Sequence, residues 1–206
     1  MTENPAAPPP HDVRALDPRS LRALAHPLRI RLLGALREFG PATASQLAQR
    51  LDESSGATSY HLRQLAAYDF VVEDPDRGTA RERWWKAAQQ GTSTDTAQFA
   101  HHPDPEVRGA LSTFLHEVAT IHAQELSTAL GTKHEWPREW HGVSDLSDFS
   151  LRLTPELTRE LSDELHAVIE RYRVRTDVDE ARAEPVRVHL HAFPRPPQTH
   201  EPSDGG

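Results

Sequence analysis

Cysteine is absent from all 206 residues of the chain. Without a thiol, the protein has no disulfide, no thiolate metal site and no cysteine nucleophile. A redox switch based on thiols is excluded for the same reason. Any chemistry of this protein must therefore depend on other side chains.

Long apolar runs are absent as well. No segment approaches the roughly 20 consecutive apolar residues that a membrane-spanning helix requires. Residues Met1 to Pro10 contain no basic residue and no apolar stretch of the kind found in a signal peptide. We therefore expect a cytoplasmic protein without a membrane partner.

Basic residues are in the minority, with 23 Lys and Arg against 31 Asp and Glu, for a net charge of −8. The charge is unevenly divided. Residues 18–90 contain 11 basic and 8 acidic residues (+3), whereas residues 91–206 contain 11 basic and 20 acidic residues (−9). A mildly basic half joined to an acidic half is compatible with a nucleic-acid reader that carries a regulatory domain.

Composition also predicts the domain boundaries. Residues 1–14 and 194–206 lack a hydrophobic period, so we predict disordered tails there. A stretch rich in Gln, Thr, Ser and Ala predicts a linker at 91–103. The remaining ranges predict two domains, at 15–90 and 104–193.

Two predicted helices open the first domain. Asp17 followed by Pro18 is typical of a helix start, and Pro27 begins the next helix. That second helix ends at Gly40. Its apolar face is formed by Leu28, Leu32, Leu33 and Leu36.

A short helix, a tight turn and a longer helix follow. Thr43 and Gln46 form a T-x-x-Q capping box, which predicts a helix start, and Ser54 caps the longer helix. The buried side of the longer helix is predicted to contain Thr58, Leu62 and Leu65. This order, over residues 42–67, is that of a helix-turn-helix, whose second helix packs on one side and enters the DNA major groove with the other.

The free face of this second helix follows from a rotation of about 100 degrees per residue. Arg63 can bond guanine or phosphate, Tyr60 can reach phosphate or sugar, and Gln64 can bond adenine. Small residues on the same face allow close approach. The predicted contacts of this helix are Ser55, Gly56, Ser59, Tyr60, Arg63 and Gln64; their division between bases and backbone stays open.

A hairpin directly follows that helix. Phe70 to Val72 predicts a strand, Pro75 to Gly78 a turn, and Thr79 to Lys86 a returning strand. A glycine-tipped loop with arginines suits contact with flanking phosphates or the minor groove, although an ordinary surface hairpin has the same pattern. The predicted contacts of this wing are Arg77, Arg81 and Arg83.

The chain resembles the arsenical-resistance-repressor-like (ArsR-like) winged-helix family in the segments LRALAHPLRIRLLGAL, SQLAQRL, SSGATSYHLRQLAAYDFVVED and RGTARERWW, over about residues 16–87. Ser59, His61 and Leu62 match the S-x-H-L of that family's recognition helix, and Arg81 matches a recurrent basic residue of its wing. The resemblance implies a dimeric DNA-binding transcription factor, often a repressor that an effector releases. Metal-sensing members carry a cysteine pair on the recognition helix, which this sequence lacks.

The second domain is predicted to run helix, strand, helix, strand. Asp104 and Pro105 start a long helix to about Leu130, with a 4-3-4-3 apolar seam suited to a helical partner. The seam contains Val107, Leu111, Phe114, Val118 and Ile121. Alternation predicts strands at 149–153 and 186–190, with a helix from Pro155 between them. The predicted fold class is α+β, with dimerisation through the long helix.

Other residue groups carry weaker signals. None of the thirteen histidines has a diagnostic metal spacing, and His189 and His191 on one strand face would need further ligands. Trp136 and Trp140 could line an effector pocket, but we favour packing in a core or dimer interface. No motif of a hydrolase, metalloprotease or phosphate-binding loop occurs. We expect neither catalysis nor a cofactor.

The sequence thus predicts a transcriptional regulator. We expect a dimeric repressor that reads an inverted repeat in double-stranded DNA, with a C-terminal domain for dimerisation and for sensing a small-molecule effector. The alternative is a protein-interaction module whose winged helix docks another protein. Binding to one short DNA site separates the two hypotheses.

Overall fold

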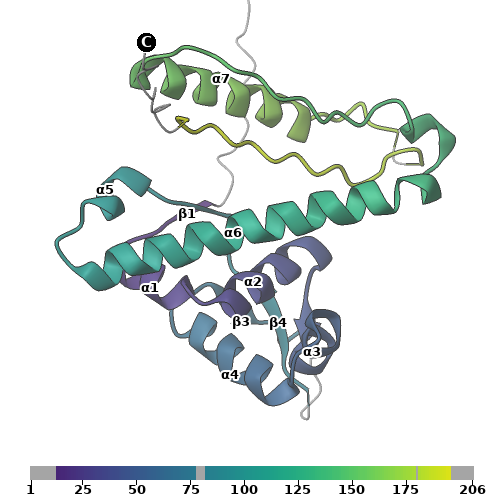
Figure 1. Cartoon of the computed structure of the whole chain (residues 1–206). Helices are drawn as coiled ribbons and strands as arrows, with labels where there is room; N and C mark the ends of the chain where they lie inside the picture. The colour runs from purple at the N-terminus through teal and green to yellow at the C-terminus, as the bar shows by residue number, and fades with distance from the viewer. Residues whose placement is uncertain (1–12, 78–81, 180, 196–206) are drawn as a thin grey trace, which may run out of the picture. The chain divides into compact units, whose positions relative to one another are not determined.

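The computed structural model describes residues 13–77, 82–179 and 181–195, which divide into two compact units, one ending at Glu135 and one beginning at Trp136 (Figure 1). The first unit mixes helices and short strands, and the second contains one long helix. This confirms the predicted α+β class with an N-terminal helix-turn-helix region. The predicted tails lie almost wholly outside the described residues.

Two capped helices begin the first unit, as predicted: α1 (Pro18–Leu24) and α2 (Pro27–Phe39). The Asp17 carboxylate accepts a hydrogen bond from the Ser20 backbone N–H at 2.6 Å, which satisfies a free donor of the first turn. Gly40 ends α2 with a φ of +79°, a conformation that favours glycine.

The next two helices are α3 (Ala44–Leu51) and α4 (Ser55–Ala66), joined by a turn at Asp52 in the left-handed region. The predicted capping box is formed: the Gln46 N–H donates to the Thr43 hydroxyl at 3.2 Å, and the Thr43 N–H donates to the Gln46 side chain at 2.9 Å. The predicted buried side of α4 is also confirmed, and consists of Thr58, Leu62 and Leu65.

A three-stranded antiparallel sheet completes this region, in the order β2 (Ala42–Thr43), β4 (Trp84–Ala87), β3 (Val71–Glu73). The predicted hairpin is therefore present, with Val72 opposite Lys86. Its first strand is shifted by one residue from the prediction, and its second strand is Trp84–Ala87 where Thr79 to Lys86 was predicted. Its tip, residues 78–81, lies outside the described residues.

The stretch predicted as a linker, 91–103, instead contains secondary structure. Strand β5 (Gly91–Ser93) pairs in parallel with β1 (Val13–Ala15), and α5 (Thr96–Ala100) buries Phe99 completely. Gly91 permits the close pairing, because a Cβ there would lie 3.2 Å from a Val13 methyl. Weak periodicity concealed these elements, since each contributes few apolar residues to the core.

Helix α6 (Pro105–Gly131) packs against α1 and α2, and so belongs to the first unit. Its Val107 and Leu111 are buried in the main core, and Phe114 packs against that core. The part of the seam that we predicted for another protomer is thus occupied within the chain. The leucines of α1 and α2 share that core with Val107 and Leu111.

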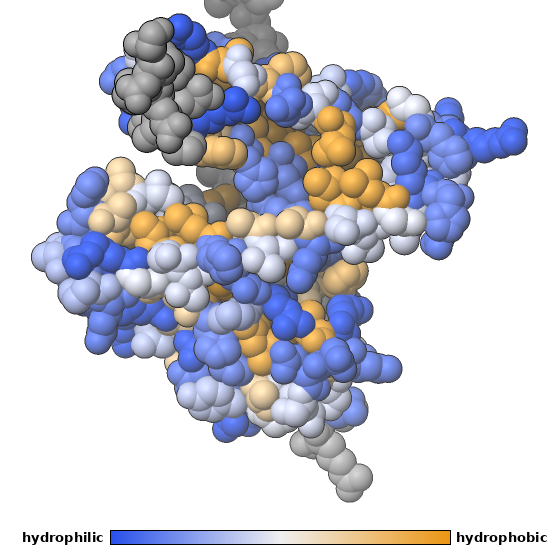
Figure 2. All heavy atoms as spheres, in the orientation of Figure 1, coloured by the Kyte–Doolittle hydropathy of each residue, from blue (hydrophilic) through white to orange (hydrophobic). Residues whose placement is uncertain are grey.

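The second unit contains η2 (Arg138–Trp140) and α7 (Pro155–Arg173); η1 (Lys133–Glu135) precedes it. The strands predicted at 149–153 and 186–190 are wrong, because neither segment forms a strand in the structure. A strand needs a hydrogen-bonded neighbour, and alternation of side chains does not supply one. Many apolar side chains of this unit are exposed on its surface (Figure 2).

Replacing Thr43 by alanine is expected to lower the free energy of unfolding by about 1 kcal/mol, because the capping box loses one of its two hydrogen bonds. Chemical denaturation of the variant and the wild type measures this. Thr43→Ser keeps the acceptor and serves as the control. Equal stability of the alanine variant would contradict the assigned role of the cap.

Candidate nucleic-acid interface

Helix α4 presents a polar face opposite its packed side. Tyr60 is 49% exposed. Of the predicted contacts, Ser55, Gly56, Tyr60 and Arg63 are exposed, whereas Ser59 and Gln64 are half-buried. A Cβ added at Gly56 would meet no atom within 4 Å, so this glycine serves no packing contact inside the chain. The face is therefore open at its N-terminal end.

Arg63 is held along the helix rather than by another element. Its Nε–H donates to the Ser59 carbonyl oxygen at 3.1 Å, one turn earlier. The two terminal nitrogens of the guanidinium remain available for a bidentate contact with guanine or phosphate. This bond orients the side chain outward before any ligand is present.

His61 ties α4 to the start of α2, which the sequence did not reveal. Its ring centroid lies 4.3 Å from that of His26, and its Nδ1 accepts a hydrogen bond from the Arg29 Nε–H at 3.3 Å. His26 caps α2, since its Nδ1 accepts from the Leu28 N–H at 3.2 Å. Both rings thus use Nδ1 as an acceptor, which requires the neutral form. A histidine directly before a proline was the signal that could have indicated the cap.

Burial lowers the pKa of both histidines, and the nearby Arg29 charge lowers both further. The neighbouring His26 ring also lowers the pKa of His61. The Glu53 carboxylate acts against the lowering of both pKa values, and the Glu117 carboxylate acts against the lowering of the His26 pKa. The native state therefore prefers neutral rings more strongly than the unfolded chain does.

Because the folded pKa values lie below the unfolded value of 6.5, stability from this pair is fully present above pH 6.5 and is lost as the pH falls through the folded values. We expect the wild type to lose more stability between pH 7 and about pH 5 than the double variant His26→Asn, His61→Gln, which keeps a capping amide and cannot titrate. Thermal denaturation across this range gives the comparison. Parallel pH profiles would contradict the expectation.

The base of the wing is held by a buried carboxylate. Asp74 is 7% exposed, and its Oδ1 lies 3.3 Å from Lys86 Nζ on β4. Its Oδ2 lies 3.6 Å from Arg77 Nε, and the Arg77 guanidinium lies 6.0 Å from the centre of the Trp84 ring. The predicted contact Arg77 is therefore partly neutralised and oriented inside the wing.

Arg83 lies further along the returning chain. Its side chain is 68% exposed and pairs with Glu73 on β3 at 3.2 Å. Exposed pairs of this kind contribute little to stability, so the pair can open toward a phosphate at small cost. The third predicted wing contact, Arg81, lies outside the described residues.

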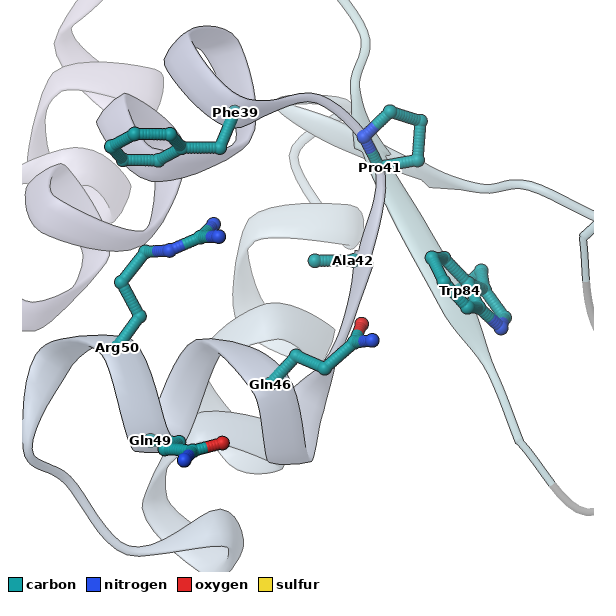
Figure 3. A pocket seen from close by; sticks show the side chains of 7 residues that line it. All are labelled: Phe39, Pro41, Ala42, Gln46, Gln49, Arg50 and Trp84. Atoms are coloured by element: carbon teal, nitrogen blue, oxygen red, sulfur yellow. The ribbon is translucent and has the colours of Figure 1, made fainter.

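An open groove runs beside α3, on a surface for which the sequence predicts no site (Figure 3). The Arg50 guanidinium lies 4.1 Å from the centre of the Phe39 ring, across one side of the groove. Trp84 lines the other side, whereas its neighbour Trp85 is buried in the core. The lining residues are Phe39, Pro41, Ala42, Gln46, Gln49, Arg50 and Trp84.

Two predictions concern the second unit. The ring centroids of His189 and His191 lie 6.2 Å apart, which brings the pair together without a strand. Trp136 and Trp140 are half-buried, and the Trp136 carbonyl oxygen contacts His141 Nε2 at 3.0 Å. Their roles as an effector pocket or as packing residues stay a prediction.

Among the helices that the structure describes, none is both long enough and apolar enough to cross a membrane.

Residues 24–74 match the family model of a helix-turn-helix domain. This range includes α2, α3, α4 and β3, so the chain contains such a domain where the sequence predicted it. The match covers less than half of the chain. No curated protein is significantly similar to the whole sequence.

Solved structures give weaker likenesses. A mutant of ZitR from Lactococcus lactis is 17% identical, with 75% of this chain and 83% of that chain covered, at a TM-score of 0.27. YusO from Bacillus subtilis is 13% identical, with 77% and 86% covered, at a TM-score of 0.30. The adhesin competence repressor AdcR from Streptococcus pyogenes is 15% identical, with 72% and 81% covered, at a TM-score of 0.26. Superpositions at these scores do not assign residues.

Proposed function

We propose that this chain is a DNA-binding transcriptional regulator, which reads double-stranded DNA with α4 and with the wing between β3 and β4. The observation that carries the proposal is the two-sided character of α4 within the matched helix-turn-helix domain. One side is buried, and the other presents a small residue, a tyrosine and an oriented arginine to solvent. A helix that enters the major groove needs both sides.

Charge supports the same surface. Residues 18–90 carry a net charge of +3 in a chain of −8, so the segment with excess positive charge is the one that contains α4 and the strands of the wing. Phosphate contacts depend on Lys and Arg, and supply most of the sequence-independent affinity. In this proposal the wing arginines contact the backbone, and Arg63 and Gln64 contact base edges.

The finer parts of the proposal concern family and mode of action. The S-x-H-L sequence of α4 supports the ArsR-like group, whose members are often dimeric repressors, and the protein is proposed to be a non-enzymatic member with a small-molecule effector. The absence of cysteine argues against a thiolate metal sensor of that group. A dimer would read an inverted repeat.

Selection of genomic fragments by the purified full-length chain tests the function. The expected result is one short inverted repeat, with half-site centres roughly 34 Å apart, because two recognition helices of a dimer enter successive major grooves. Enrichment of asymmetric single sites would contradict the dimeric reading. Failure to enrich any sequence would contradict the function itself and favour the protein-docking alternative.

Arg63→Ala is expected to weaken binding to the selected site by roughly 5- to 150-fold, equivalent to about 1 to 3 kcal/mol, if the guanidinium reads a guanine bidentately. Preference at that base pair should relax, while thermal stability stays unchanged. Fluorescence anisotropy with matched and mismatched duplexes measures both effects. Arg159→Ala, on the exposed surface of α7 and outside the helix-turn-helix domain, removes the same charge and should leave affinity unchanged.

A further inference from the structure

Helix α7 carries a continuous apolar stripe that its own unit covers only in part, since Leu161 is half-buried and Leu165 and Val168 are 37% and 38% exposed. At about 100 degrees per residue, the stripe falls within an arc of about 80 degrees. No residue of α7 is buried, and Leu157 and Tyr172 are 47% and 67% exposed. The stripe consists of Leu157, Leu161, Leu165, Val168 and Tyr172.

The spacing of this stripe is that of a helix pair. From Leu161 the residues follow at intervals of 4, 3 and 4, the pattern of side chains that interlock between two helices. A single helix cannot bury such a seam by itself. The small second unit has no buried residue among those described, so it offers no core for this face.

The charges along α7 identify the partner. Residues 155–164 contain four acidic residues and one basic residue (−3), whereas residues 165–173 contain one acidic and two basic residues (+1). A parallel copy of the helix would place −3 beside −3. An antiparallel copy places the acidic half of each helix beside the basic half of the other, which attracts.

We propose that α7 is a self-association surface, on which α7 of a second copy of this chain packs antiparallel about a two-fold axis. Leu165 lies near the axis, and Glu160 lies beside Arg171 of the partner subunit at each end of the seam. This surface deepens the proposed function, because a dimer built on it supplies the two-fold symmetry that an inverted repeat requires. In that one respect the proposal rests on the proposed function. It also moves the dimer seam from α6, where the core occupies Val107 and Leu111, to α7.

Sedimentation of the full-length chain tests the surface without DNA, so its outcome is independent of the DNA-binding test. The wild type should sediment at twice the 23.1 kDa chain mass at micromolar concentration. Leu165→Glu should raise the dimer dissociation constant by about 100-fold or more, because two like charges meet at the axis. His166→Glu, about 140 degrees around the same helix from the centre of the stripe, adds the same charge and should leave the dimer intact.

Charge reversal tests the antiparallel arrangement. Glu160→Arg and Arg171→Glu should each weaken the dimer, and the double variant should restore it. The two residues are three turns apart on one helix, so no contact within a helix can explain rescue. A monomeric wild type, or an unchanged dimer in Leu165→Glu, would overturn the proposal. A Leu165→Glu variant that stays dimeric but loses thermal stability would also overturn the proposal, because α7 would then be covered by residues of its own chain. Lack of rescue would overturn the antiparallel pairing.

Discussion

Gly56→Glu is expected to abolish measurable binding to the selected DNA site while leaving the protein folded. Gly56 lies in the first turn of α4, and a Cβ there meets no atom within 4 Å, so the fold accommodates the side chain. A carboxylate near a helix N-terminus is favourable for the helix itself. Against DNA, the same carboxylate opposes the phosphates and fills the space that close approach requires. Like charges brought together cost several kcal/mol, so affinity should fall by at least about 100-fold.

The control for this prediction is Gly109→Glu. Gly109 is exposed on α6, and a Cβ there also meets no atom within 4 Å. The two variants therefore have the same composition and net charge. Anisotropy titrations should show wild-type affinity for Gly109→Glu alone. If Gly56→Glu bound DNA as the wild type does, with its helix content intact, α4 would not be the element that enters the groove.

Leu62→Ala should produce the largest loss of stability. Leu62 lies on the packed side of α4, is fully buried and belongs to the core that joins α2, α3 and α4. Removing a buried leucine side chain beyond Cβ costs roughly 2 to 5 kcal/mol, because apolar transfer energy is lost and a cavity remains. Chemical denaturation measures the change in the free energy of unfolding.

Leu62→Met is the control for the loss of side-chain volume at this position. Methionine conserves most of the leucine volume, so its cost should stay below about 1.5 kcal/mol. DNA binding by Leu62→Ala should fall only in proportion to the unfolded fraction, since the side chain faces the core. A specific loss of affinity in the fully folded variant would mean that α4 is displaced rather than destabilised.

Sequence patterns predicted the local features of the fold well, because those features depend on neighbouring residues. Asp17, Thr43, Ser54 and Asp104 cap helices where the sequence placed caps. Helical period likewise separated the buried Leu62 from the exposed Tyr60. In both cases the determining contacts lie within one or two turns of the chain.

Features that depend on distant residues were not predictable in the same way. Val13–Ala15 pairs with Gly91–Ser93, and neither segment is long enough to show the alternation of apolar and polar residues that predicts a strand. The segments 149–153 and 186–190 have the alternation of strands but no strand beside them. Alternation predicts which side of a strand is apolar, but it does not predict whether a neighbouring strand is present to pair with it.

The candidate interface shows the same division. The outward direction of Arg63 follows from its position on the helix. The ion pair of Arg77 with Asp74, and the contact of His61 with His26, follow from how separate elements meet. The sequence placed Arg77 in the wing, and the structure shows that the buried carboxylate of Asp74 is its neighbour.

The packing of α5 and α6 into the first core sets the order in which the protein can fold during synthesis. A nascent chain that has reached residue 90 already contains α1 to α4, but lacks Phe99, Val107 and Leu111, which complete the core. At ribosomal rates of roughly 5 to 20 residues per second, the last of these three side chains is added about 1 to 4 s later. Until then the leucines of α1 and α2 are partly uncovered, so the helix-turn-helix is most exposed to aggregation and to chaperones in this interval.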